Sequence, residues 1–382
     1  MALNYLAPSP YASIVTRNGA FQADVNGLIS SVGAGMQALD LLEAGCVPLP
    51  YNPFANFRNL IDGGDFSINP FQRNIPDLAS GGVISSPIAA TPTYFADRFF
   101  AAGSAGSAIL MAAVADTTIV GFNQSLKVSR QAGNTSASTI SVGQVIETFD
   151  ALRCQGQTVT LSFWAKAGAT YSGGQLNVQI VYGAGNNQSA ASLLASTWSG
   201  QSNALSATQT LTQGMTRYQF TGAVPANASQ LAMLLSFNPT GTAGADDSIS
   251  INGLQLEIGA SASPFERLDA QVVLELCQRY AWVQPEPAAG VVIGAGANTS
   301  ASSQLFYMAT PVPLLKGPTV TVSAGAFKTN QAGVATTTTI TPGATHTPNA
   351  ISINGNSSGT VGRATMLQGG GGSGWILASA DF

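Results

Sequence analysis

Apolar and polar residues alternate most regularly between Gly156 and Ala167. Val159, Leu161, Phe163 and Ala165 occupy one parity, and Thr160, Ser162, Trp164 and Lys166 occupy the other. A period of two is typical of a strand with one buried face. That apolar face needs a second sheet to cover it, so the segment predicts a β-sandwich rather than an isolated hairpin.

Trp164 is the exception on the polar face of this predicted strand. An indole at such a position either contacts a ligand or lies beneath a crossing loop. We favour the loop.

Further alternating segments, separated by polar loops, predict strands at 176–180, 217–220 and 231–237. Between 249 and 258 the apolar parity changes after Ile251. A one-residue bulge at Asn252-Gly253 would place the apolar residues on both sides of it on the core face. The Gly/Asn/Ser-rich stretch from Gly183 to Ala207 predicts a loop, and such loops often carry recognition.

Residues 1–55 predict a small separate unit. Asn18-Gly19 and Asn26-Gly27 indicate a hairpin, and Met36 to Ala44 reads as a short helix. A hairpin and one short helix bury too little surface to be stable alone. We therefore expect this unit to dock on a partner, as an anchor does.

A connecting helix is predicted within residues 268–284. The helix is expected from Leu268 to Trp282, with Asp269 as its cap. Its apolar stripe consists of Val272, Val273, Leu276, Cys277 and Tyr280. This helix can lie on the sandwich or pair with copies of itself, and we favour the second.

A β-domain is expected at 285–382, after a sandwich at 56–267. Its strand candidates are 305–308, 319–322 and 351–353, with a turn at Asn354-Gly355. Thr337–Thr341 and Gly369–Gly374 read as low-complexity loops. The predicted fold class is thus mostly β: an anchor, a sandwich, one helix and a C-terminal β-domain.

Charge is scarce along the whole chain. Only 8% of residues are charged, whereas globular domains have about 25%. Such a composition suits a protein that is covered by partners or works outside the cell. The net charge of −4 provides no basic surface for nucleic acid. The longest apolar run, Ala108 to Ala115, is too short to insert through a membrane.

The cysteines and the N-terminus bear on where the protein works. Cys46, Cys154 and Cys277 are far apart and are expected to be reduced thiols. The first residues lack the features of a secretory signal. Together with the low charge, this favours a protein made in a cytoplasm and released in a particle such as a virion.

Several segments in order resemble a known family. They are Asn59–Ile68, Gln72-Arg73, Ala96–Phe99, Leu126–Arg130, Leu161–Ala167, Ile249–Gly259, Pro264–Arg267 and Leu276–Tyr280. In this order they resemble the jelly-roll, carbohydrate-binding-like domain of phage tail fibres and other virion structural proteins. The resemblance covers roughly Asn59 to Trp282.

The resemblance implies a non-enzymatic fibre or decoration subunit of a bacteriophage virion. Residues 1–55 would then contact other virion proteins, and a homotrimer is expected. The alternative is an adhesin that attaches the phage to a host surface glycan.

Catalytic chemistry finds little support in the residues. His346 is the only histidine and has no nucleophile signature near it. Asp246-Asp247 is the only adjacent carboxylate pair, and we favour a solvated loop over a hydrolase site. We expect no enzyme activity and no cofactor, except for the calcium ion considered below.

Two binding hypotheses remain. Exposed aromatic residues and planar polar groups recognise sugars, and the candidates are Trp164, Lys166, Tyr182 and Trp198, with Asn177 and Gln179. Packing is the favoured alternative for Tyr182 and Trp198. The resemblance also implies a structural calcium ion, for which Asp62, Asp65 and Glu257 are candidates. Ordinary surface carboxylates are the favoured alternative there.

Overall fold

A computed structural model describes residues 4–6, 13–16, 19–22, 28–29, 47–49, 58–66, 83–84, 92–94, 98–103 and 109–381. The chain forms two units by its internal contacts, Met1–Asn59 and Leu60–Phe382. No helix in the described part is long and apolar enough to cross a bilayer.

The first unit contains short antiparallel strands. β1 (Asn4–Leu6) lies between β4 (Leu28–Ile29) and β5 (Val47–Leu49). β2 (Ser13–Thr16) pairs with β3 (Gly19–Gln22), which confirms the predicted hairpin. The helix predicted at 36–44 lies outside the described residues.

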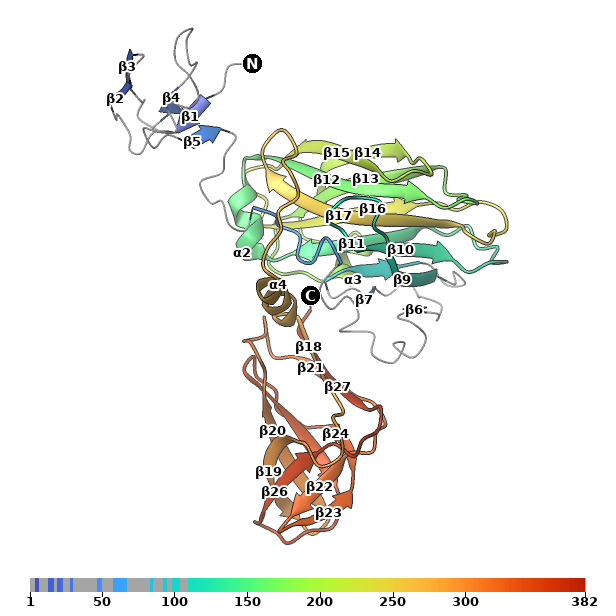
Figure 1. Cartoon of the computed structure of the whole chain (residues 1–382), viewed down its shortest axis with the longest axis vertical. Helices are drawn as coiled ribbons and strands as arrows, with labels where there is room; N and C mark the ends of the chain where they lie inside the picture. The colour runs from blue at the N-terminus through green and yellow to red at the C-terminus, as the bar shows by residue number, and fades with distance from the viewer. Residues whose placement is uncertain are drawn as a thin grey trace. The chain divides into compact units, whose positions relative to one another are not determined.

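The central body of the second unit is a sandwich of two six-stranded antiparallel sheets (Figure 1). In order, the first sheet contains β15 (Thr216–Ala223), β12 (Thr158–Ala167), β17 (Ser248–Ile258), β10 (Gln124–Arg130), β9 (Ile109–Ala115) and β6 (Val83–Ile84). The second contains β14 (Ser202–Thr210), β13 (Gln175–Gly183), β16 (Gln230–Phe237), β11 (Ile140–Ile146), β8 (Phe100–Ala102) and β7 (Thr93–Tyr94). From β11 to β17 the chain passes from one sheet to the other at every step except β13 to β14, which gives a jelly roll.

The core lies between the two sheets, as the alternation predicts. Leu161 and Phe163 of β12 are completely buried, as are Val178 and Ile180 of β13. Burying one such side chain contributes about 1.5–3 kcal/mol. The sandwich is therefore held mainly by the apolar faces that the sequence marks.

The predicted bulge in β17 is confirmed. Ser162 lies opposite Gln255 and Trp164 lies opposite Asn252, so two residues of β17 face Phe163. Gly253 has a φ of +57°, and a Cβ added there would lie 2.6 Å from the Trp164 ring. Only glycine fits this position without strain.

Two predictions within the sandwich are wrong. The sequence from Asn59 to Ile68 also predicts a strand, a Gly-rich turn and a second strand, but its described residues, 59 to 66, contain a turn and no strand. Gly64 approaches β17 so closely that an added Cβ would lie 2.2 Å from the Leu254 carbonyl oxygen. The expected loop 183–207 contains α3 (Ala190–Leu194) and the start of β14. β14 is an edge strand whose side chains stay largely exposed, so it carries no apolar alternation.

Helix α4 (Ala270–Gln278) ends four residues before the predicted Trp282, which lies in β18 (Ala281–Pro285). The Asp269 cap is confirmed by its bond from the Gln271 backbone N–H at 2.9 Å. The end of α4 contacts the sandwich. The Arg98 guanidinium lies 3.4 Å from the Tyr280 ring centre, and the Tyr280 hydroxyl donates to Glu147 at 2.8 Å. Glu147 precedes two short helices, α2 (Thr148–Ala151) and η2 (Leu152–Cys154).

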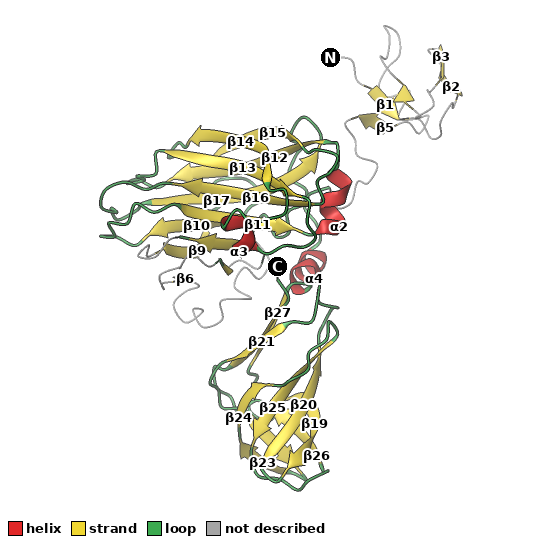
Figure 2. Cartoon of the chain, turned by 180° about the vertical axis from the view of Figure 1, so that it is seen from behind, coloured by secondary structure: helices red, strands yellow, loops and turns green. Residues whose placement is uncertain are grey.

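The C-terminal residues form two more antiparallel sheets (Figure 2). One has the order β18, β27 (Trp375–Ser379), β21 (Thr319–Val322). The other has the order β23 (Val334–Thr337), β22 (Lys328–Gln331), β26 (Ala364–Gln368), β19 (Val292–Ser300), β20 (Ser303–Ala309), β25 (Ala350–Asn356), β24 (Thr339–Pro342).

The predicted strands of this region are confirmed, but two connections are not. Asn354-Gly355 lies inside β25 instead of forming a turn. The expected loop Thr337–Thr341 belongs largely to β23 and β24, since β-branched threonine suits an extended strand.

Candidate functional site

The outer face of the first sheet is covered in part by loops. The Trp164 ring packs on Phe122 at 5.3 Å between ring centres, and Phe122 packs on Phe265 at 5.2 Å. Phe122 belongs to the loop between β9 and β10. Arg217 of β15 places its guanidinium 4.8 Å from the Trp164 ring. Trp164 therefore lies beneath a loop, which is the arrangement that the sequence favours.

A cleft of about 410 Å³ opens on the same face, beyond Trp164. Its lining includes Val114 of β9, Lys127 of β10, Lys166 of β12, Ser250 of β17, and Gln213 and Asp246 from loops. Lys166, Lys127 and Ser250 come from neighbouring strands, because Ser250 lies opposite both lysines in the β-ladder. The strand register therefore brings the polar side chains together.

Each lysine of the cleft has a carboxylate partner. Lys127 Nζ lies 2.7 Å from Asp246 Oδ1, and Lys166 Nζ lies 2.9 Å from Asp116 Oδ2. The two lysine side chains are about one-third exposed, at 33% and 32%, and Asp246 is 38% exposed. Asp116 is only 6% exposed and lies behind Lys166. The charges of the cleft thus cancel in pairs.

Both carboxylates stay ionised over the ordinary pH range. The hydrogen bond from Lys127, with further bonds from the Ala169 backbone N–H and the Ser248 hydroxyl, lowers the pKa of Asp246 to about 2. Burial by itself would raise the pKa of Asp116, but bonds from Thr118 and Lys166 lower it to about 2. The paired charges therefore persist well into the acid range.

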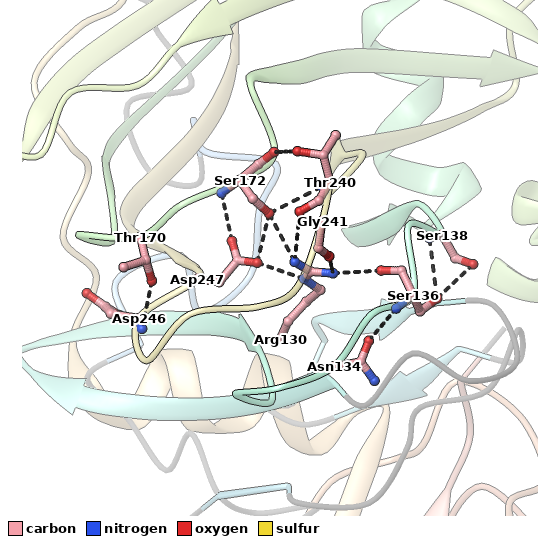
Figure 3. Close-up of polar contacts among 10 residues, drawn as sticks. All are labelled: Arg130, Asn134, Ser136, Ser138, Thr170, Ser172, Thr240, Gly241, Asp246 and Asp247. Carbon is pink, nitrogen blue, oxygen red and sulfur yellow. Dashed lines mark hydrogen bonds and ion pairs between the residues drawn. The ribbon is translucent and has the colours of Figure 1, made fainter.

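Arg130 forms an ion pair with Asp247, the residue that follows Asp246 of the cleft (Figure 3). Arg130 Nε lies 2.7 Å from Asp247 Oδ2, and both side chains are completely buried. The other guanidinium nitrogens donate to the carbonyl oxygens of Ser136, Thr240 and Gly241 and to the Ser172 hydroxyl. The Ser172 backbone N–H donates to Asp247 Oδ1 at 2.8 Å. We call Arg130 and Asp247 the clamp, because together they join the loops after β10, β12 and β16.

The clamp corrects the expectation of a solvated Asp246-Asp247 loop. Asp246 reaches the cleft, but Asp247 is fully buried because Arg130 and Ser172 hydrogen bond to it. The Asp246 backbone N–H also donates to the Thr170 hydroxyl at 3.0 Å (Figure 3). The backbone at Asp246 is thus fixed by its own hydrogen bond to Thr170 and by the contacts of Asp247.

The four sugar-binding candidates do not converge. Lys166 lines the cleft and Trp164 lies beneath its loop, whereas Tyr182 and Trp198 belong to the side of the second sheet. Trp198 is 3% exposed, and its indole N–H donates to the Ser189 carbonyl at 2.9 Å. The sugar-binding candidacy of Trp198 is therefore wrong and the favoured alternative, a packing residue, is confirmed, because a buried ring has no face for a sugar. Tyr182 is half-buried against the core, and Asn177 and Gln179 are half-buried on the same strand.

The three calcium candidates are not assembled into a site. Asp62 accepts from Arg98 Nε at 3.2 Å, Asp65 lies 3.9 Å from Arg267, and Glu257 accepts from the Ser263 backbone N–H at 2.8 Å. Within the described residues, no group of three or more His, Cys, Asp or Glu side chains is placed to hold a metal ion. Each of the three carboxylates instead contacts another part of the protein.

Sequence reasoning missed Lys127 and Asp246 as members of the cleft. The two lie far apart in the chain, and no local motif links them. Lys127 has the parity of the polar face of its strand, which is the one signal that points to it.

No protein-family model matches the chain, and no curated protein matches it. Solved structures similar to it include a CBM4 module, at 20% identity over 52% of this chain and 99% of that one, with a TM-score of 0.31. A Family 11 Carbohydrate-Binding Module from Clostridium thermocellum matches at 9% identity over 44% and 91%, with a TM-score of 0.29.

The enzymatically active domain of bacteriophage CBA120 tailspike protein 4 matches at 14% identity, with a TM-score of 0.32. The match covers 53% of this chain and 22% of that one. The assignment of the central body as a jelly-roll β-sandwich rests on its own strand order and core.

Proposed function

We propose that the chain is a non-enzymatic subunit of a bacteriophage virion, and that its sandwich binds a glycan in the cleft. The observation that carries the glycan part is the cleft itself. Its volume of about 410 Å³ lies within the range of small-molecule sites, about 300–1,000 Å³. Lys127, Lys166 and Ser250 lie on hydrogen-bonded strands, and the two ion pairs of the cleft are already formed, so a ligand meets a preorganised surface.

The groups of the cleft suit sugar hydroxyls. A lysine ammonium has three N–H donors, and the contact to a carboxylate uses one of them in Lys127 and in Lys166. The Gln213 amide and the Ser250 hydroxyl add donors and acceptors, and Val114 adds an apolar contact. Such a mixture fits the alternating C–H and O–H surface of a sugar ring.

The same cleft does not favour hydrolysis. A glycoside hydrolase needs a carboxyl group that holds a proton near neutral pH, together with a second carboxylate. The pKa values of Asp246 and Asp116 are instead both lowered to about 2. Neither group is a general acid at neutral pH, which supports a binding role.

Binding is expected to depend on Lys166. Replacing Lys166 by Met keeps the approximate length of the side chain and removes its ammonium N–H donors. The affinity for a glycan that binds the native protein should therefore fall by about tenfold to a hundredfold. Isothermal titration with ligands from a glycan array measures this change. The control is Lys316→Met, since Lys316 is exposed in a loop away from the cleft lining. If the unmutated protein binds no glycan on the array, the glycan role is wrong.

The virion part of the proposal is supported by two features. Only 8% of residues are charged, and residues 59–282 resemble domains of phage virion proteins. On this proposal, residues 1–55 anchor the chain to other virion proteins, the protein is located in the virion, and the assembly is a homotrimer.

The virion proposal predicts three chains per assembly. Native mass spectrometry of the whole chain is expected to give the trimer mass, and immunogold labelling should decorate intact particles. A monomer at high protein concentration, or unlabelled particles, would contradict this part of the proposal and leave the glycan site to be tested on its own.

A further inference from the structure

We infer that the cleft selects an uncharged glycan and excludes acidic polysaccharides through its own charge balance. The inference rests on the proposed glycan-binding function and names the ligand class of that site. Three features of the cleft support it: the pairing of its charges, the fixed position of Asp246, and the packing of the half-buried Trp164 on Phe122.

The first feature is the charge balance. Among the described residues that line the cleft, the charged ones are Lys127, Lys166 and Asp246. Asp116 compensates Lys166 at 2.9 Å, and Asp246 compensates Lys127 at 2.7 Å. A sugar carboxylate would therefore find no uncompensated cation and would approach the partly exposed carboxylate of Asp246. The sugar carboxylate and the Asp246 carboxylate carry the same charge and repel each other, which disfavours binding of the acidic ligand.

The second feature is the fixed position of Asp246. Its carboxylate receives hydrogen bonds from the Ala169 backbone N–H at 3.0 Å and the Ser248 hydroxyl at 2.8 Å, in addition to Lys127. The next residue, Asp247, is held by the clamp. Asp246 therefore cannot turn away to admit an anion without breaking several bonds.

The third feature is the place of Trp164. Its ring packs on Phe122 and does not line the cleft. The described residues that line the cleft are lysine, aspartate, serine, glutamine and small apolar residues, with no aromatic ring among them. Recognition would then come from hydrogen bonds to hydroxyl groups. Neutral sugars offer these groups at every ring position, and an uncharged ligand leaves both ion pairs intact.

The test is the near-isosteric substitution Asp246→Asn, which removes the negative charge of the carboxylate. It keeps the shape of the side chain and leaves Lys127 without a compensating carboxylate. Soluble neutral polymers (dextran, mannan, xylan) and acidic polymers (alginate, polygalacturonate) serve as probes in titrations at low and high salt. The native protein is expected to bind a neutral probe and to reject both acidic ones. Asp246→Asn should gain about tenfold in affinity for an acidic probe, and the gain should disappear at high salt.

The matched control is Asp150→Asn. Asp150 pairs with Arg153, and it is 40% exposed, close to the 38% of Asp246, but it does not line the cleft. This control should leave the preference for neutral probes unchanged.

The outcomes separate the two proposals. A native protein that prefers alginate or polygalacturonate overturns the inference while the glycan-binding function stands. An Asp246→Asn variant that still rejects acidic probes also overturns it, because charge balance would not be the cause. A native protein that binds no probe, neutral or acidic, and no glycan on the array counts against the binding function itself.

Discussion

Replacing Arg130 by Met is expected to lower the free energy of unfolding of the sandwich by about 3–5 kcal/mol. Arg130 and Asp247 are both completely buried, 2.7 Å apart. Without the guanidinium, the Asp247 carboxylate would stay in the interior with no cation, and the carbonyl oxygens of Ser136, Thr240 and Gly241 would lose their donor. Urea unfolding of the whole chain, followed by tryptophan fluorescence, measures the loss.

The control for this prediction is Arg153→Met. Arg153 lies 2.9 Å from Asp150, but the two side chains are 39% and 40% exposed. Ion pairs that are exposed to solvent contribute only about 0–1 kcal/mol to stability. The free energy of unfolding of this variant should therefore be close to that of the native protein. The double variant Arg130→Met, Asp247→Leu should lose less than the sum of its single changes, because it leaves no unpaired charge. Equal losses for Arg130→Met and Arg153→Met would contradict the role of burial.

Replacing Glu286 by Ala is expected to destabilise the C-terminal β-domain by at least about 3 kcal/mol. Glu286 is 9% exposed, and its carboxylate accepts four backbone N–H bonds, from Ala326, Gly370, Gly372 and Gly374, at 2.9 to 3.0 Å. Without it, these donors would be left largely unsatisfied. Hydrogen exchange of the Gly370 and Gly372 amides should become much faster in the variant.

The matched control is Glu275→Ala. Glu275 is an exposed residue of α4 whose carboxylate accepts a bond from Gln271. Its replacement should leave the exchange of Gly370 and Gly372 unchanged. If the Glu286→Ala variant exchanges like this control, the carboxylate does not hold the glycine-rich loop.

The Glu286 contact should also depend on pH. Burial by itself would raise the pKa of Glu286, but the backbone bonds from Gly372, Gly370, Ala326 and Gly374 outweigh it and lower the pKa below its ordinary value of 4.5. A carboxyl group whose folded-state pKa is lowered stabilises the fold fully above its unfolded pKa, and this stability is lost as the pH falls through the folded value. The Gly370 and Gly372 amides of the native protein should therefore stay protected from hydrogen exchange to below pH 4.5.

Glu286 also changes the interpretation of Gly369–Gly374. Its composition suggests a flexible loop, and no pattern in the sequence connects it with a glutamate that lies 84 to 88 residues earlier in the chain. In the fold, the small residues allow the backbone to wrap around the carboxylate. A Cβ at Gly374 would lie 2.8 Å from Glu286 Oε2, so glycine is required by contact as well as by flexibility.

Strands were predictable from the sequence where at least one face packs against the core. β12, β13, β15 and β16 and the bulge in β17 follow from the alternation, since the period of a strand is a local property. β14 and β23 were missed for the opposite reason. They are edge strands with mostly exposed residues, so neither face carries an apolar pattern.

The candidate site was predictable only in part. Lys166 was found because it lies on the polar face of β12. Lys127 and Asp246 were not found, because only the β-ladder and the loop before β17 bring them beside it. Packing was the favoured interpretation of Trp198, but its polar neighbours in the sequence do not show what covers the ring, which is buried in the fold.

The sequence by itself determined the β architecture, the placement of the central core, the bulge and the scarcity of charge, because each depends on neighbours in the chain or on composition. The tertiary structure alone decided which charges meet, which aromatic rings are covered and where the cleft lies. These depend on strand register and on loops that return from distant positions, and the free energy of an ion pair depends on how deeply the fold buries it.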